Sequence, residues 1–430
     1  MTLIELGERT EPTDPEPSRR RRRFGNSPTA LVLVALVVLL TLAGAAPAGP
    51  RMQAILPSSL AARVYLTGDQ ILTVVPVPGA TYGSQELLAY RRPERAAGSP
   101  HQLTPLWRMP MGPFDRVETA ERVDDFGLVL SLFRERVGSE TLLLDSRTGQ
   151  LRWRKPGFAT LDASGRVQLR TYDAEVPITF AAVELAGGRE LWSVSSKATW
   201  VTYHQRDATI DAVVISTVTG DIEVLDPETG ALRDRVRATS DEPGGYRRVW
   251  VIGDLVLADN SQGVVAYDID GLVRRWRTAG SPIESVDQCG ALLCARDIDR
   301  ATHVLDPATG AVLWSVDDVY LLRADDRRAL AADYRAIPVA KVTTIDAGTG
   351  RIAVDHGTWD LVDEVDHAPY LLGTRSIPKV GAVLARLDLT QAQPRRIDML
   401  PGAVGNCQYR DDLIACRRQN GDFGLWQLRD

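Results

Sequence analysis

Lysine is scarce in this chain of 430 residues, since only four of its 50 basic residues are lysine and the rest are arginine. Acidic residues number 56, which leaves a formal net charge of −6. Nucleic-acid-binding surfaces are usually strongly basic, so this balance argues against a nucleic-acid partner. Glycine (35) and proline (25) stay near their usual frequencies, which excludes a collagen-like or largely disordered chain.

The common motifs of enzymes are also missing. There is no Gly-x-Gly-x-x-Gly, no P-loop and no Gly-x-Ser-x-Gly. The five histidines are isolated, and none has the spacing of a metal ligand. The densest polar cluster is Asp363, Glu364, Asp366 and His367, which could hold Ca²⁺ but more often marks a solvated strand end. We therefore assign no catalytic, cofactor-binding or metal-ligating residue from the sequence.

One long apolar run stands near the N-terminus. Residues 29–46 carry no charge, and five arginines at 19–23 precede them. Such a run can nearly cross a bilayer as a helix, with the arginines on the cytoplasmic side. The sequence thus predicts a disordered cytoplasmic tail over 1–28, a transmembrane signal anchor over 29–48 and an extracytoplasmic domain over 51–430. A cleaved signal peptide ending at the small residues 46–48 is the alternative.

Cysteine is rare, and all four residues lie in the exported part: Cys289, Cys294, Cys407 and Cys416. An even number of cysteines in an oxidising compartment predicts two disulfides, for which counting allows three pairings. Each close pair flanks a hairpin-like turn, which favours local bridges between Cys289 and Cys294 and between Cys407 and Cys416. Two pairs of buried free thiols are the alternative.

A repeat of about forty residues runs through the exported part. Its anchor is an acidic residue followed by Thr-Gly or a related turn, at positions 145, 184, 226, 268, 306, 346 and 388. This period fits one four-stranded blade of a β-propeller. The flanking segments alternate apolar and polar residues, as in 127–133, which excludes helical repeats. The fold class is therefore all-β.

The repeated residues have a structural explanation. The aspartate bonds its own backbone in a tight turn, and the glycine accepts a positive φ. The tryptophan four residues later lies on the outer strand, where it can cover the junction with a neighbouring blade. The turn positions are Asp145, Gly149, Asp226, Gly230, Asp306, Gly310, Asp346 and Gly350, and the docking positions are Trp107, Trp153, Trp192, Trp276 and Trp314.

The number of blades depends on how the ring closes. The last unit, 407–428, has only three predicted strands, and residues 52–57 could supply the fourth. Propellers typically have four to eight blades. We predict a single propeller of eight blades, with nine as the alternative.

The pattern Asp-x-x-Thr-Gly-x-x-x-Trp resembles the tryptophan-docking repeat of the PQQ-binding-like β-propeller superfamily, over about residues 60–430. At two docking positions the chain departs from this pattern, with Arg233-Asp234 and Val354. The superfamily includes quinoprotein alcohol dehydrogenases and the propeller lipoprotein of the outer-membrane β-barrel assembly machinery. The enzymes hold a quinone through calcium and carry two adjacent cysteines, whereas the close cysteine pairs here enclose four and eight residues.

The resemblance and the predicted anchor together favour a non-catalytic, membrane-tethered platform that binds proteins or ligands at the cell envelope, without a cofactor. Its expected partners are the membrane and an envelope protein. A quinone- or calcium-dependent extracytoplasmic enzyme of the quinoprotein dehydrogenase type is the alternative function.

Overall fold

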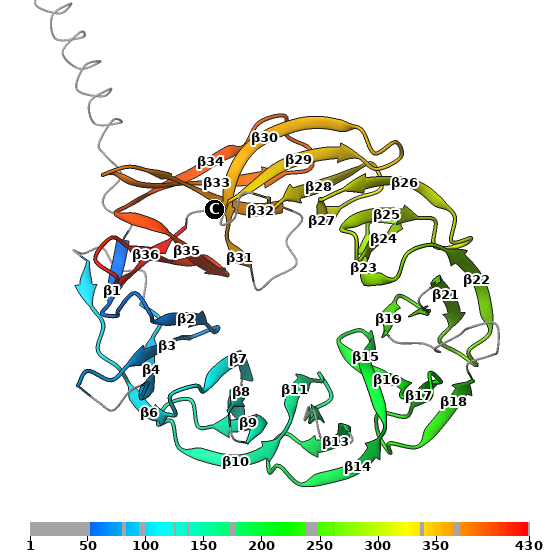
Figure 1. Cartoon of the computed structure of the whole chain (residues 1–430). Coiled ribbons are helices and arrows are strands. Elements are labelled where there is room, and N and C mark those ends of the chain that lie inside the picture. The colour runs from blue at the N-terminus through cyan, green and yellow to red at the C-terminus, as the bar shows by residue number, and fades with distance from the viewer. Residues whose placement is uncertain are drawn as a thin grey trace, which may run out of the picture. The chain divides into compact units, whose positions relative to one another are not determined.

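The computed structural model describes residues 52–428, apart from 80–82, 94–99, 124–125, 136, 172–177, 238–247, 261, 336–338 and 365–369. These residues form antiparallel sheets that follow one another around a ring (Figure 1). No helix long and apolar enough to cross a membrane occurs in the described ranges, and the predicted anchor over 29–48 lies outside them.

Each sheet is built from strands that are consecutive in the chain, beginning with the innermost. The strands of the first four sheets are β2 (Arg63–Leu66), β3 (Gln70–Pro76), β4 (Gln85–Arg91) and β6 (Trp107–Met111); β7 (Arg116–Val123), β8 (Gly127–Arg134), β9 (Gly138–Leu144) and β10 (Leu151–Pro156); β11 (Phe158–Leu161), β12 (Arg166–Arg170), β13 (Ile178–Glu184) and β14 (Glu190–Ser196); and β15 (Ala198–Arg206), β16 (Thr209–Thr217), β17 (Ile222–Leu225) and β18 (Leu232–Val236).

The second half of the ring continues this order. Its strands are β19 (Arg248–Ile252), β20 (Leu255–Asp259), β21 (Gly263–Asp268) and β22 (Arg274–Ala279); β23 (Ile283–Cys289), β24 (Leu292–Asp297), β25 (Ala301–Leu305) and β26 (Val312–Asp317); β27 (Tyr320–Ala324), β28 (Arg328–Asp333), β29 (Ala340–Asp346), β30 (Ile352–Leu361), β32 (Tyr370–Ile377), β33 (Gly381–Asp388) and β34 (Arg395–Pro401); and β31 (Asp363–Glu364), β35 (Ala403–Arg410), β36 (Leu413–Arg418) and β37 (Phe423–Gln427).

The strand β30 belongs to two four-stranded units. It pairs with β29 as far as Trp359, and then with β32 through Asp360 and Leu361, so that the two units merge into one sheet of seven strands. The described chain is therefore an all-β propeller of about eight blades. It has eight hydrogen-bonded sheets, or nine four-stranded units if the two that share β30 are counted separately.

The ring is closed by the N-terminal end of the described chain. Strand β1 (Met52–Leu56) pairs antiparallel with β37 and adds the fourth strand to the last unit, which confirms the predicted role of residues 52–57. In Figure 1, the blue β1 accordingly lies beside the red strands. A short strand from the insertion in the first unit, β5 (His101–Gln102), extends this sheet by pairing parallel to β1. Opening the ring would break hydrogen bonds between the two ends of the propeller.

The hydrophobic core lies between neighbouring sheets. Leu72 and Leu87 of the first sheet, for example, pack in one cluster with Leu128, Leu130 and Leu142 of the next. The middle strands are therefore buried on both faces and read as nearly continuous apolar runs.

The tryptophan-docking contact recurs at five junctions. Trp192 donates its indole N–H to the carbonyl oxygen of Pro227 in the next blade, at 3.0 Å. Its ring covers Gly230, which has a φ of 70° and where a Cβ atom would lie only 2.6 Å from the indole. The other four tryptophans make the same indole-to-carbonyl contact with the following turn: Trp107 with Ser146, Trp153 with Leu185, Trp276 with Pro307 and Trp314 with Ala347.

A β-bulge in the outer strand precedes four of these tryptophans, all except Trp107. In β14 the ladder skips Leu191, so that Glu190 and Trp192 pair with consecutive residues of β13. Equivalent register shifts precede Trp153, Trp276 and Trp314. A bulge increases the local twist and redirects a side chain, and here it precedes a ring that docks on the next blade.

The acidic turn holds the glycine and carbonyl that receive each tryptophan. Asp145 Oδ1 accepts hydrogen bonds from the backbone N–H and the hydroxyl of Thr148, both at 3.0 Å. Asp145 Oδ2 pairs with Arg152 at 2.9 Å. The hydrogen bonds from Arg152 and Thr148 lower the pKa of Asp145 from 3.8 to about 2. Asp226, Asp306 and Asp346 anchor their turns in the same way.

At the two departures from the repeat, other contacts replace the tryptophan. Arg233 turns back onto Asp226 of its own blade. Across that junction, Arg206 reaches Asp254 of the next blade at 3.3 Å. At the second departure, Val354 stands on β30, the strand that joins the two units by direct backbone pairing.

We predict that Trp192→Ala will destabilise the propeller by about 3–5 kcal/mol, because it removes a buried indole and leaves a cavity at the junction. Urea denaturation should show a lower midpoint. Leu191→Ala is the matched control, because Leu191 precedes Trp192 on the same strand and is 38% exposed. Equal losses for both variants would show that docking does not stabilise the ring.

Because the turn aspartates are ionised in the folded protein, we expect the stability of the propeller to fall at low pH. Since the folded-state pKa of Asp145 lies below its ordinary value, its stabilising effect is present above about pH 4 and is lost as the pH falls toward 2. We expect Asp145→Asn to be less stable than the native chain at pH 7, and the difference to shrink between pH 4 and pH 2. Asp326→Asn, a change at an exposed carboxylate that makes no hydrogen bond in the described chain, serves as the control in thermal unfolding. A difference that stays constant with pH would contradict the prediction.

Candidate functional site

The candidate site lies where the ring closes. A cavity of about 550 Å³, here called the seam cavity, receives residues from the inner strands β2, β7, β30 and β35 and from β36 and β37. Its polar lining side chains are Arg63, Tyr65, Glu118, Asp360, Asn406, Gln408 and Arg417. Residues that are more than 350 positions apart in the sequence therefore meet in one cavity.

The strand β35 is irregular where it borders this cavity. Its pairing with β36 shifts register twice, before and after Gly405, and Asn406 has a φ of 49°. Gly405 has a φ of 130°, a conformation that side chains rarely adopt, and a Cβ atom there would lie 2.8 Å from Asp360 Oδ2. Non-glycine residues in this backbone region cost energy and occur often at functional sites. The bulge presents Asn406, Cys407 and Gln408 to the cavity.

A disulfide holds the irregular strand in place. Cys407 and Cys416 are bonded, with their Cα atoms 4.1 Å apart, and both are buried. The bond joins the bulged part of β35 to β36, one residue before Arg417. It therefore fixes two elements of the cavity wall relative to each other.

Arg417 is the most buried cation of the site, with 7% of its surface exposed. Its guanidinium donates to the carbonyl oxygens of Ser59, Ala62 and Gly421, and it lies over the ring of Phe423 at 4.3 Å. Its Nε has no hydrogen-bond partner, and burial lowers its pKa. Arg417 thus ties β36 to the segment before β2 through carbonyl groups, without a carboxylate to neutralise its charge.

The remaining charges of the cavity are unevenly matched. Glu118 pairs with Arg116 at 3.6 Å, and Asp360 also has an interaction partner. Arg63, by contrast, has no ion-pair partner in the described part of the chain. It lies beside Tyr65. Burial raises the pKa of Tyr65, and Arg63 offsets part of that rise. The two arginines are therefore the uncompensated charges of the cavity.

A second cavity of about 440 Å³, the aromatic cavity, adjoins the first and shares Arg63, Tyr65 and Val117 with it. Phe133 and Phe114 supply its aromatic surface, and Phe114 is 50% exposed. The guanidinium of Arg116 lies 5.1 Å from the ring centre of Phe133. Polar side chains line this cavity as well, among them Gln85, Asp115 and Glu135, so that an aromatic surface lies beside charged groups next to the seam cavity.

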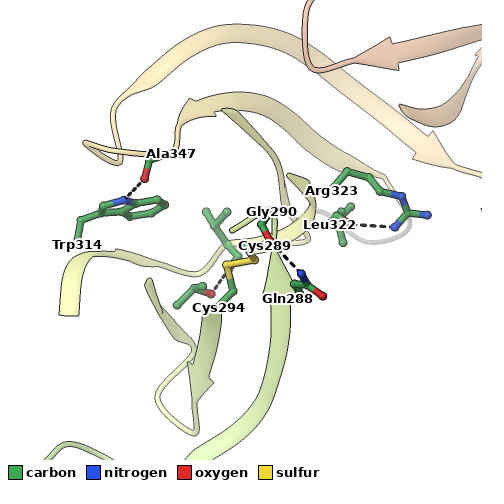
Figure 2. Close-up of a disulfide and its surroundings, with 10 residues drawn as sticks. Gln288, Cys289, Gly290, Cys294, Trp314, Leu322, Arg323 and Ala347 are labelled. Atoms are coloured by element: carbon green, nitrogen blue, oxygen red, sulfur yellow. Dashed lines mark hydrogen bonds between the residues drawn. A yellow bond between two sulfur atoms is a disulfide. The ribbon is translucent and has the colours of Figure 1, made fainter. Parts of the chain in front are cut away.

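The other disulfide stabilises a junction on a different part of the ring. Cys289 and Cys294 are bonded across the hairpin of β23 and β24, close to the docked Trp314 (Figure 2). They pack in a small cluster with Leu321 of the next blade. At the tip of this hairpin, a Cβ atom on Gly290 would lie 2.6 Å from the backbone of Asp325. This disulfide therefore supports packing between blades and borders no described cavity.

The histidines are less isolated than their spacing suggests. His204 bonds Asp211, His303 bridges Asp297 and Ser315, and His356 bonds Thr344. All of these are contacts within one sheet, between residues that the sequence separates by 6 to 12 positions.

A metal-held quinone does not fit the residues that the structure describes. No group of three or more His, Cys, Asp or Glu side chains among them is arranged to hold a metal ion. Neither disulfide joins adjacent cysteines. Asp366 and His367 of the acidic cluster lie outside the described residues, and for Asp363 and Glu364 only the strand β31 is described. No reaction step is therefore derived through such a group.

The predicted turn and docking residues do not line the seam cavity, apart from Cys407 of the predicted disulfides. Sequence reasoning missed Arg63, Asn406, Gln408 and Arg417. The signal that could have indicated them is Gly405-Asn406 inside a strand pattern, because an isolated glycine there suggests a bulge.

The family model of the outer membrane protein assembly factor BamB matches residues 104–316. Among solved structures, BamB from Moraxella catarrhalis is similar, with 16% identity, a TM-score of 0.42 and coverage of 86% of this chain and 97% of its own. The C-terminal WD40 domain of Sif2 has 10% identity and a TM-score of 0.47, covering 88% and 99%. Saccharomyces cerevisiae Sqt1 has 10% identity and a TM-score of 0.46, covering 88% and 96%.

No curated protein matches the chain significantly. The family-model match spans five blades, from the first tryptophan dock to the outer strand that carries Trp314. Within that span, each of the five docking tryptophans donates its indole N–H to a carbonyl of the following turn. On these grounds the chain is a PQQ-like β-propeller repeat protein.

Proposed function

We propose that this protein is a membrane-tethered interaction platform outside the cytoplasm, which binds a segment of an envelope partner protein at the aromatic and seam cavities. The observation that carries the proposal is the half-exposed Phe114 at a cavity of mixed aromatic and polar lining, which shares Arg63, Tyr65 and Val117 with the seam cavity. Concave, largely pre-formed sites with an apolar surface and a few polar groups are typical of ligand recognition.

Phe114 lies between β6 and β7, in the connection from the first blade to the second. We expect binding at this end of the sheets. In an antiparallel blade, the turn between the second and third strands lies at the same end as the connection to the next blade. We call this end the loop face. Its exposed apolar side chains stand at positions that the repeat does not dictate: Leu60, Phe114, Val137, Val218, Ile298 and Val380. Such residues suit contact with a partner.

Exposed aliphatic residues elsewhere have a different origin. Those at the start of the outer strands, such as Leu151, Leu232 and Val312, recur in five blades two residues after the turn glycine. They therefore follow from the repeat itself and do not distinguish one part of the ring. The aromatic cavity, by contrast, lies between the first two sheets and adjoins the seam cavity.

The proposed location outside the cytoplasm is supported by the two disulfides, which persist in oxidising compartments. The tether is the apolar run over 29–48, with the arginines of residues 19–23 on the cytoplasmic side.

The platform is tested by placing a photocrosslinking phenylalanine analogue at position 114 in cells. We expect one defined envelope protein to be captured, and the same protein tagged in turn to capture this chain. The matched control is the analogue at Phe126, which is 36% exposed. Phe126 lies between β7 and β8, at the end of the blade opposite the loop face. Equal capture at both positions, or none at 114, would overturn the proposed binding face.

The tether is tested separately by alkaline carbonate extraction and by protease added outside intact cells. We expect the full chain to stay with the membrane fraction, its propeller to be open to external protease, and a chain beginning at residue 49 with an added secretion signal to be released. Release by carbonate of a chain that lacks residues 1–48 would contradict the anchor and indicate a cleaved signal peptide.

A further inference from the structure

We propose that the seam cavity is a recognition site for a carboxylate presented by the partner segment. This inference rests on the proposed function and deepens it, because it names the chemistry that the cavity selects. Its evidence is two arginines that have no ion-pair partner and two side-chain amides that make no hydrogen bond among the described residues.

The first two donors are arginines. Arg63 and Arg417 both line the cavity, and neither has an ion-pair partner among the described residues. This sets them apart in a molecule where most neighbouring arginines are paired, as Arg92, Arg116 and Arg134 are. Two uncompensated positive charges in one cavity favour an anionic ligand.

The other two donors come from the bulged strand. The side-chain amides of Asn406 and Gln408 line the same cavity and make no hydrogen bond within the described chain. The left-handed conformation of Asn406 is held by the disulfide at the next residue, Cys407. The chain therefore maintains an energetically costly backbone conformation where these amides border the cavity.

The acidic lining residues do not cancel this excess of positive charge. Glu118 forms an ion pair with Arg116 at 3.6 Å. Asp360 has an interaction partner, and its carboxylate lies next to Gly405. The groups in excess are thus the positive charges of Arg63 and Arg417 and the two side-chain amides, which together suit a carboxylate better than a cation or an apolar group.

The carboxylate can come from a peptide C-terminus or from an acidic side chain, and the adjoining aromatic cavity suits an apolar neighbour in either case. The test uses three short peptides that share one phenylalanine. The first is blocked at both ends and carries one glutamate, the second has a free C-terminal carboxylate as its only acid, and the third is blocked and uncharged. Binding to the purified full chain is measured by isothermal titration calorimetry.

We expect at least one of the charged peptides to bind, more weakly as salt is raised, and the uncharged peptide to bind at least tenfold more weakly. The charged peptide that binds better identifies the source. Arg63→Gln and Asn406→Gly should each weaken that binding, Arg63→Gln by about tenfold or more. Glycine at 406 keeps the left-handed backbone, and Arg63 is exposed, so neither change threatens the fold.

Arg274→Gln is the matched control, because Arg274 is exposed on β22 and has no ion-pair partner in the described chain. Equal binding of all three peptides, no binding of either charged peptide, or equal losses from Arg63→Gln and Arg274→Gln would overturn the carboxylate site. The crosslinking at position 114 reads out partner capture independently. A captured partner without carboxylate selectivity would therefore refute this inference alone, whereas absence of capture would refute the platform.

Discussion

The contact between a tryptophan and the turn of the next blade is the constraint on which this propeller depends. A four-stranded sheet has two apolar faces and cannot cover them by itself, so each blade must be placed at a fixed distance from its neighbour. The indole ring of Trp192 on Gly230, with its N–H bonded to Pro227, sets that distance. A larger residue at the glycine would push the blades apart, and a smaller residue at the tryptophan would leave a void.

The repeat cannot provide this contact where the ring closes. The last unit takes its fourth strand from β1, so its outer strand has no turn and tryptophan of its own. Three other interactions replace the docking contact there. They are the pairing of β1 with β37, the Cys407–Cys416 disulfide and the hydrogen bonds of Arg417 to the segment before β2. Packing at the seam is less regular than elsewhere, and the candidate cavity occurs there. The irregularity that closure imposes thus creates the place where a binding site can form.

The seam also explains why specificity can differ between related propellers. Residues at regular junctions are tied to the repeat, and changing them disturbs blade packing. Lining residues of the seam cavity, such as Arg63, Asn406 and Gln408, carry no docking role. They can therefore change with the partner while the ring is preserved, in keeping with the rule that function resides in sites placed on a fold.

The sequence by itself determined the repeat, the all-β class, the turn and docking positions, the local cysteine pairs and the strand at residues 52–57 that closes the ring. These are encoded in short patterns, because a turn or a hairpin depends on residues a few positions apart. Only the tertiary structure decided that β30 is shared by two units, that Arg63 and Arg417 meet in one cavity, and that their charges have no carboxylate partner. Such facts depend on closure, which brings together residues more than 350 positions apart, and no local pattern records which side chains will face each other across the seam.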